Sequence, residues 1–327
     1  MKKQLITGLA LCAAAMFFVI LVSSTGTSDA AELTLTANMI KEIPAGPDAP
    51  AWQKAKAIQI PFVGKEQFAG KKADVTAKAL YTADTVYFLF RWKDATQSTA
   101  KGAWEFDGQK WSHRKGNEDR ISLLFEINRI NNFATKGCAV TCHGPAGKPA
   151  KEFKFATASA AEKGDLWQWK AARSAPYNAV DDGWLTVAGE KTGRQNDAGG
   201  GGDVKNEVTD KSKPLYMQDP GKKPSAPGFL LMEEAVEIKD YSGFKAGDVI
   251  TYQMPKKPDG SRADVKAISS YGAGGWTVML SRKLDTGNDD DVVFNARKKY
   301  PFALALFDDS GDENSYDSEV ITLEFGR

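Results

Sequence analysis

Cysteine and histidine are both scarce in this sequence, whose 327 residues include three cysteines and two histidines. Secreted proteins that rely on disulfides carry more cysteines over longer loops, so a disulfide framework is excluded. A structural zinc site needs four ligands, and His113 lies thirty residues from the only other histidine, His143, which argues against zinc. So few histidines also leave little room for a catalytic triad of serine, histidine and acid.

The sequence also lacks the patterns that nucleic acids and nucleotides require. No run of Lys and Arg interleaved with aromatic residues occurs, so the sequence offers no surface for releasing the counterions of a nucleic acid. Gly199–Gly202 is not followed by Gly-Lys-Ser/Thr, which indicates a loop rather than a phosphate cradle. We therefore expect no nucleic acid as a partner.

One long apolar run stands at the N-terminus. Lys2 and Lys3 precede Leu5–Val22, and Ser28-Asp29-Ala30 offers a small-x-small cleavage site. Residues 1–30 are predicted to be a secretory signal peptide, and residues 31–327 one domain outside the cytoplasm, in the periplasm. The alternative is an uncleaved segment, the one case in which we expect a membrane contact. Without residues 1–30, basic and acidic residues are equal in number.

Apolar alternation and short β-rich runs favour strands almost everywhere. Thr82–Thr85 is predicted to be a hairpin turn and Gly272–Gly275 the turn into the strand at Trp276. Residues 188–228, with several lysines and prolines, are expected to form a surface excursion. The fold class expected is all-β, an antiparallel β-sandwich with long loops. The expected strands are Leu33–Ala37, Ile58–Val63, Val75–Tyr81, Val86–Trp92, Ile121–Ile127, Trp276–Leu284, Phe302–Phe307 and Val320–Phe325.

The segment from Gly137 to Gly144 carries the chemistry. Cys138 and Cys142 are followed at once by His143. Attachment of haem c needs two thiols that reach the two vinyl groups of one porphyrin edge, followed by a histidine that binds iron. The spacing of three residues between the cysteines is a less common variant of the usual two. A short disulfide or two free thiols is the alternative, but closing so small a loop removes little unfolded-state entropy.

Several further segments resemble the haem-binding family typified by the gamma subunit of ethylbenzene dehydrogenase, with related subunits in dimethylsulfide dehydrogenase, chlorate reductase and selenate reductase. The resemblance covers most of the chain after the signal. It is carried by Pro50–Ala55, Asp165–Ala171, Gly275–Val278, Ser281–Gly287 and Tyr300–Asp308.

This resemblance implies a β-sandwich that holds haem at one edge and passes electrons to or from a molybdenum enzyme, beside molybdenum and iron–sulfur subunits. Family members with haem b use methionine and lysine ligands, and their methionine lies where Cys138–His143 stands here. The sequence therefore resembles a c-type branch with one covalent haem c, in which His143 is the proximal iron ligand. Asn314 stands where some c-type relatives have a ligand histidine.

The chemistry of the residues does not identify the distal ligand of the haem iron. Met217, on a proline-bounded loop, is preferred, and His113 is the alternative. A neutral lysine is a further possibility. The remaining methionines after the signal are Met39, Met232, Met254 and Met279, of which Met232 and Met279 lie in strand-like runs that suggest core packing.

Three more groups have two interpretations each. Trp167 and Trp169 share one face of a strand and either contact the porphyrin or fill the sandwich core. Lys170 and Arg173 either neutralise haem propionates or belong to a solvated face. Asp285–Asp291 either holds calcium through oxygen ligands or forms a turn.

The function expected is electron transfer by an exported monohaem c-type cytochrome, which is not itself an enzyme. Its expected partner is a redox protein, in a complex or met as a free shuttle. The competing hypothesis is a carbohydrate- or small-ligand-binding β-sandwich module without haem, because related sandwiches carry exposed tryptophans.

Overall fold

The computed structural model describes residues 33–64, 68–142, 155–189, 192–310 and 316–326. Residues 1–30 and His143 therefore lie outside the described residues. Within the described part, no helix is long and apolar enough to cross a membrane.

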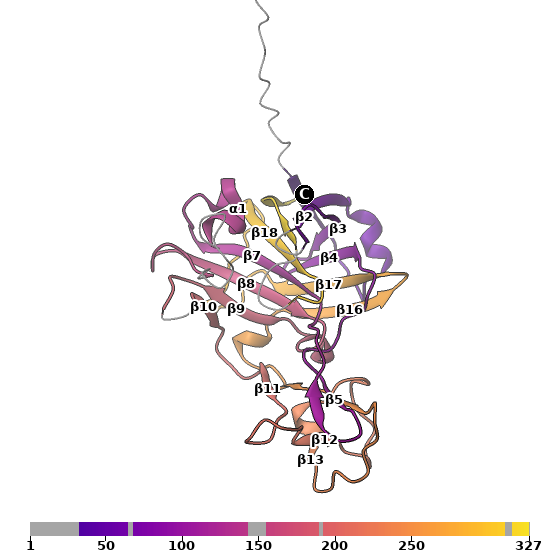
Figure 1. Ribbon diagram of the computed structural model, residues 1–327. Helices are drawn as coiled ribbons and strands as arrows, with labels where there is room; N and C mark the ends of the chain where they lie inside the picture. Colours follow the sequence, from indigo (N-terminus) through magenta and orange to yellow (C-terminus); the bar gives the residue numbers. More distant parts are fainter. Residues whose placement is uncertain (1–32, 65–67, 143–154, 190–191, 311–315, 327) are drawn as a thin grey trace, which may run out of the picture. The chain divides into compact units, whose positions relative to one another are not determined.

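One large β-sheet dominates the chain (Figure 1). Its order is β10-β9-β8-β7-β18-β19-β2-β3-β4-β17-β16, with β1 beside β20 and β3. Its strands are β1 (Leu33–Met39), β2 (Ile58–Gly64), β3 (Lys72–Tyr81), β4 (Thr85–Lys93), β7 (Arg120–Asn128), β8 (Lys163–Lys170), β9 (Asp181–Leu185), β10 (Arg194–Asn196), β16 (Lys266–Gly272), β17 (Gly275–Lys283), β18 (Tyr300–Phe307), β19 (Tyr316–Ser318) and β20 (Ile321–Phe325).

The part of this sheet that contains β8 packs face to face against the part that contains β4. Phe88 of β4 meets Trp167 of β8 with ring centroids 6.0 Å apart, and Trp92 meets Trp169 at 6.1 Å. Side chains of both parts belong to one buried apolar cluster. The all-β sandwich expected from the sequence is thus confirmed, although β1 runs parallel to both of its neighbours.

Both predicted hairpin turns are present. The backbone N–H of Thr82 donates to the carbonyl of Thr85 at 2.8 Å, and β3 pairs with β4 in antiparallel register. Ala273 and Gly274, with φ of 51° and 73°, connect β16 to β17. Two successive residues with positive φ match the twist of the flanking strands, which explains the glycine at position 274.

Seven short strands form three small sheets. Figure 1 shows several of these strands gathered away from the main sheet. Buried Asn206 joins them, because its side chain donates to the carbonyls of Tyr216 and Thr251 and Trp104 donates to its backbone carbonyl. The strands are β5 (Trp104–Phe106), β6 (Trp111–His113), β11 (Asp203–Lys205), β12 (Tyr216–Gln218), β13 (Ala235–Glu237), β14 (Val249–Ile250) and β15 (Gln253–Pro255).

Residues 188–228 are therefore not a featureless loop. They contain β10, β11 and β12, and β10 extends the main sheet beside β9. At their start, the backbone N–H of Gly193 donates to the carbonyl of Phe155, which follows the cysteine segment. Short polar strands of this kind carry no alternation to recognise, so the sequence did not predict them.

Helical structure is sparse in the described residues. The α-helix α1 (Phe133–Thr141) follows β7 and packs against β18. Four 3₁₀ turns are η1 (Pro50–Lys54), η4 (Ala175–Tyr177), η5 (Met232–Glu234) and η6 (Ser261–Ala263).

Candidate functional site

The two cysteines lie on one turn of α1. Gly137, with φ of 68° and ψ of 178°, breaks the helix and starts a new turn at Cys138. The backbone N–H of Cys142 donates to the carbonyl of Cys138 at 2.9 Å, as in a regular α-helical turn. Residues four apart share a helix face, so the three-residue spacer directs both sulfur atoms to the same side.

Both thiols are free and lie against apolar side chains. Cys142 is buried and Cys138 half-buried, in a cluster with Leu124, Phe133 and Leu166. The two thiols also hydrogen-bond to each other, which raises the pKa of Cys138 and lowers that of Cys142. An apolar wall with two thiols on one helix face suits a porphyrin edge, so the described residues fit a covalently bound haem.

The C-terminal strands lie beside this turn. The charge of Asp317 contributes to the raised pKa of Cys138, after the hydrogen bond that Cys138 donates to Cys142 and after burial. A Cβ atom built on Gly137 would lie 3.3 Å from Val320. β19 and the residues just after it therefore lie near the cysteines, and Asn314, like His143, lies outside the described residues.

Trp167 and Trp169 are both fully buried in the sandwich core. Their rings contact other aromatic rings, with Trp169 and Trp276 centroids 4.9 Å apart. These contacts match the core interpretation of the two residues, and their contact with a porphyrin stays a prediction.

Met217 and His113 occupy the small sheets. Met217 is half-buried in β12 and pairs with Val236 of β13. His113 is exposed in β6, where its ring lies 3.7 Å from that of Trp104 and its Nδ1 lies 2.8 Å from the carbonyl oxygen of Gly102. In the described ranges, no hydrogen bond or ion pair joins either residue to α1. Neither residue belongs to the apolar cluster around the cysteines, and their role as distal ligand stays a prediction.

The other methionines vary in environment. Met254 of β15 and Met279 of β17 are buried, as core methionines are, and Met279 fits the core packing expected from the sequence. Met232 lies in the 3₁₀ turn η5 rather than in a strand. Met39, at the end of β1, is 54% exposed.

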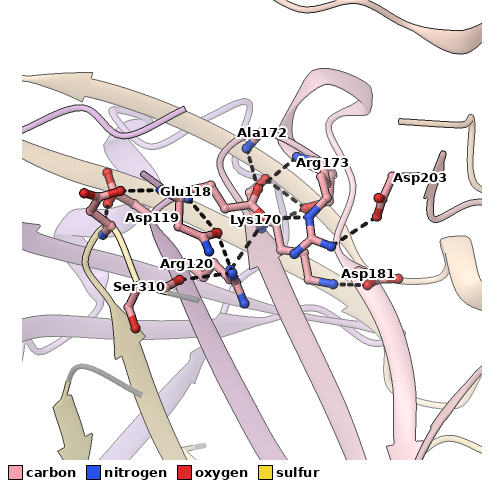
Figure 2. Close-up of polar contacts among 12 residues, drawn as sticks. Glu118, Asp119, Arg120, Lys170, Ala172, Arg173, Asp181, Asp203 and Ser310 are labelled. Atoms are coloured by element: carbon pink, nitrogen blue, oxygen red, sulfur yellow. Dashed lines mark hydrogen bonds and ion pairs between the residues drawn. The ribbon is translucent and has the colours of Figure 1, made fainter. Parts of the chain in front are cut away.

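Lys170 and Arg173 do not lie on a solvated face, because both form ion pairs with acidic side chains of the protein (Figure 2). Lys170 is buried and pairs with Asp181. Arg173 pairs through Nε with Glu118 at 2.5 Å and through Nη1 with Asp203 at 3.1 Å. Glu118 also accepts the backbone N–H groups of Ala172 and Arg173. The interpretation of these two residues as part of a solvated face was therefore wrong, because their acidic partners are far away in sequence.

Asp181 is the anion at the centre of this network. It pairs with Arg194 at 3.0 Å and with Arg262 at 2.5 Å, in addition to Lys170. Burial alone would raise the pKa of Asp181, but the three cations together lower it. We call Asp181 and its three partners, with Glu118, Arg173 and Asp203, the paired cluster.

A second buried cluster was missed by the sequence analysis. Asp165 of β8, Asp182 of β9 and Asp291 offer carboxylate oxygens within 4.8 Å of one another. Asp197, just after β10, donates its backbone N–H to the carbonyl of Asp182. We call these four residues the acidic cluster; all of them are buried.

Arg282 of β17 is the cation of the acidic cluster. Its Nη1 lies 2.5 Å from Asp165 Oδ2 and 3.0 Å from Asp291 Oδ1, and its guanidinium lies over the ring of Trp167. Burial and then repulsion from Asp165 and Asp197 raise the pKa of Asp182. Burial, with the charges of Asp290 and Asp291, raises the pKa of Asp197 to about 8.

Asp285–Asp291 was expected either to hold calcium or to form a turn. Most of that stretch forms a turn, in which Asp285 accepts the backbone N–H of Gly287 and Asp289 is exposed. Only Asp291, buried at its end, joins the acidic cluster. Spacing along the chain did not reveal the cluster, because its other members come from β8, β9 and the residue after β10.

Comparison with solved structures gives distant similarities. A protein of Bacteroides uniformis described as carbohydrate-binding matches with a TM-score of 0.40 and 7% identity, over 90% of this chain and 100% of that one. A family 9 carbohydrate-binding module of Caldicellulosiruptor kristjanssonii, in complex with cellotriose, matches with a TM-score of 0.38 and 8% identity, over 90% of this chain and 95% of that one.

No curated protein matches the sequence. The protein-family comparison is more informative, because the family described as "Ethylbenzene dehydrogenase" matches residues 49–319, which include both cysteines, the tryptophan pair and the acidic cluster. Since this match covers most of the chain, the protein belongs to the ethylbenzene dehydrogenase family.

Proposed function

We propose that this protein is an exported electron carrier with one haem c, attached through Cys138 and Cys142 and bound at iron by His143. The observation that carries the proposal is the pair of free thiols on one helical turn, with a histidine next in sequence. Membership of the ethylbenzene dehydrogenase family supports a role as a non-catalytic subunit of an oxidoreductase.

The chain's own residues would hold the group in three ways. The cysteine sulfurs would fix one porphyrin edge against the apolar cluster of Leu124, Phe133 and Leu166. Apolar burial excludes water, which tunes the potential at which a haem exchanges an electron. Because Cys142 is covered as the chain is folded here, attachment would have to precede the packing of α1 against β18.

A redox protein is the partner that fits this role. Family membership is compatible with a complex containing molybdenum and iron–sulfur subunits, and an exported carrier also fits a free shuttle. Purification from the native source separates the two versions. Co-elution with larger redox subunits supports the complex, and elution as a lone monomer supports the shuttle.

Colour and mass test haem attachment directly. The full chain would be produced in a bacterial host with the cytochrome c maturation system, and the exported protein examined by denaturing mass spectrometry and absorption spectroscopy. We expect a red protein whose mass is increased by one haem that survives denaturation. Cys138→Ala and Cys142→Ala should each leave at most one covalent bond, and the double variant none. Cys12→Ser, in the predicted signal, is the matched thiol control and should leave the haem unchanged.

A colourless product with two titratable thiols would overturn the proposal and favour the ligand-binding module. Export is checked in the same experiment, because the proposal expects the protein in the periplasmic fraction and beginning at Ala31. A cytoplasmic protein with an intact N-terminus would contradict the predicted signal peptide.

The iron ligands need separate variants. His143→Ala should change the spectrum, and an unaltered spectrum would contradict its role. Met217→Ala and His113→Ala then test the distal position, with Met39→Ala as an exposed methionine control. If Met217 is the ligand, its variant becomes high-spin and binds carbon monoxide, and an unchanged low-spin spectrum removes it.

A further inference from the structure

The acidic cluster holds more buried negative charge than its surroundings balance. Four carboxylates, from Asp165, Asp182, Asp197 and Asp291, are buried in this cluster. Arg282 pairs with Asp165 and Asp291, and the charge of Lys163 acts on Asp197, so the described cations near the cluster are fewer than its carboxylates. Burying an ionised carboxylate is costly unless a cation or hydrogen-bond donors compensate it. The cluster therefore has an electrostatic deficit that its described partners do not cover.

Unpartnered oxygen atoms identify where the deficit lies. Asp165 Oδ1, Asp182 Oδ2 and both side-chain oxygens of Asp197 are buried without a hydrogen-bond partner. Arg282 contacts Oδ2 of Asp165 and Oδ1 of Asp291, so the free oxygen of Asp165 is the one that Arg282 leaves unused. Native proteins rarely leave several such atoms in one place, which points to a ligand.

The strand geometry explains why these oxygens converge. In the β8–β9 register, Asp182 lies opposite Trp167, and Asp165 lies two residues before Trp167, on the same face of β8. Both carboxylates therefore face the space between the two halves of the sandwich. Asp291 reaches the same space from the loop after β17, and Asp197 lies within one backbone hydrogen bond of Asp182.

We propose that the acidic cluster is a binding site for one Ca²⁺ ion, with Asp165, Asp182 and Asp291 as its carboxylate ligands and Asp197 beside them. Calcium takes oxygen ligands at about 2.3–2.6 Å, so two ligands of one ion lie at most about 5 Å apart. The oxygens of Asp165, Asp182 and Asp291 meet this limit, since they lie within 4.8 Å of one another. The bound ion joins β8, β9 and the loop after β17, and thereby stabilises the sandwich.

Calcium fits this site better than a softer or smaller ion. The proposed donor set contains only oxygen, which argues against zinc and copper, because these metals prefer thiolate and imidazole ligands. Magnesium requires near-ideal octahedral geometry and keeps several waters, whereas calcium accepts irregular carboxylate cages. The proposal goes beyond the haem function and does not depend on it, because none of these ligands belongs to the cysteine turn.

The test uses the full exported chain, with haem if haem is attached. After treatment with a chelator and dialysis, CaCl₂ or MgCl₂ is added, bound metal is measured by mass spectrometry, and thermal unfolding is followed by circular dichroism. We expect about one tightly bound Ca²⁺ per chain and a melting temperature that rises by several degrees with calcium. A ligand that binds only the folded state must raise stability in this way. Magnesium should give a clearly smaller rise.

Matched variants separate the site from general acidity. Asp182→Asn should abolish both the bound ion and the calcium-dependent rise, while the calcium-free variant still folds. Asp289→Asn, which removes an exposed carboxylate from the neighbouring turn, should keep both. If Asp182→Asn does not fold, Asp291→Asn, in the loop after β17, gives the same test.

Three results would overturn the inference. They are the absence of bound calcium in the wild-type chain, a calcium-dependent rise in Asp182→Asn as large as in the wild type, or a rise of the wild type with magnesium as large as with calcium. A colourless protein that nevertheless binds calcium through Asp182 would reject the haem proposal and keep this one, so the two can fail independently.

Discussion

The paired cluster and the acidic cluster both depend on β8 and β9, yet they balance charge differently. Asp181 and Asp182 are consecutive in β9, so their side chains leave opposite faces of the sheet. Asp181 meets three cations, whereas Asp182 lies among carboxylates and keeps one oxygen without a partner. Asp181 and Asp182 therefore differ in the groups that neutralise their charges, and this difference cannot be predicted from the sequence.

This difference bears on function. A network whose anions are each matched by cations supports the fold without any added component. A buried group of carboxylates that outnumbers its cations needs either protons or a metal ion. The first arrangement indicates a structural role, and the second indicates a binding site.

The largest effect is expected from Asp181→Asn. It leaves buried Lys170 and partly buried Arg194 and Arg262 without their shared anion, and breaking a buried ion pair costs about 3–5 kcal/mol. The free energy of unfolding, measured by urea denaturation, should fall by about 4 kcal/mol. A loss below about 1 kcal/mol would mean that solvent neutralises these cations, and the contrast with Asp182 would disappear.

Arg282→Gln should be the next most damaging change in the calcium-free protein. It removes the cation that contacts Asp165 and Asp291, and also the guanidinium that packs on Trp167. We expect a loss of about 3 kcal/mol by urea denaturation, slightly less than for Asp181 because the carboxylates can take up protons instead. Arg91→Gln, at an exposed ion pair, is the matched control and should cost about 0.5 kcal/mol or less.

Asp94 gives an intermediate case, because hydrogen-bond donors replace cations around it. Its carboxylate accepts the backbone N–H of Thr96, while burial, with the nearby charges of Asp119 and Asp308, raises its pKa to about 6. A carboxyl whose pKa is raised in the folded state binds more protons there than in the unfolded chain, so stability falls as pH rises from about 4 to 6.

Asp94→Asn should remove that part of the pH dependence. Between pH 4 and 6 we expect the wild type to lose on the order of 2 kcal/mol more than the variant, measured by urea denaturation at each pH. Parallel curves for the two proteins would show that Asp94 titrates normally in the folded chain.

The smallest effect, and the opposite sign, is expected from Asp182→Asn without calcium. The amide keeps the shape of the side chain, removes one of four clustered negative charges, and donates to a neighbouring carboxylate oxygen. Unfolding by urea in the presence of chelator should show unchanged stability or a gain of up to about 1 kcal/mol. A loss like that of Asp181→Asn would contradict the distinction between the two clusters.

The positions of the long strands were predictable because the patterns that indicate them are local in sequence. Alternating side chains of β3 and β4, and the turn at Thr82–Thr85, follow from short-range periodicity and turn chemistry. The same reasoning missed β9, because its first two residues are aspartates. Asp181 is partly buried and Asp182 buried beside partners that are distant in sequence, so no local pattern predicts a strand there.

The sequence alone determined the chemistry that the cysteine segment offers. Two cysteines four residues apart and an adjacent histidine define a haem c hypothesis whatever the fold, because covalent attachment depends on residues that are neighbours in the chain. Only the tertiary structure decided how Asp165, Asp182, Asp197 and Asp291 act together. Their carboxylates come from two strands and two loops, and the electrostatic cost that makes them a candidate calcium site arises only when folding removes water from all four.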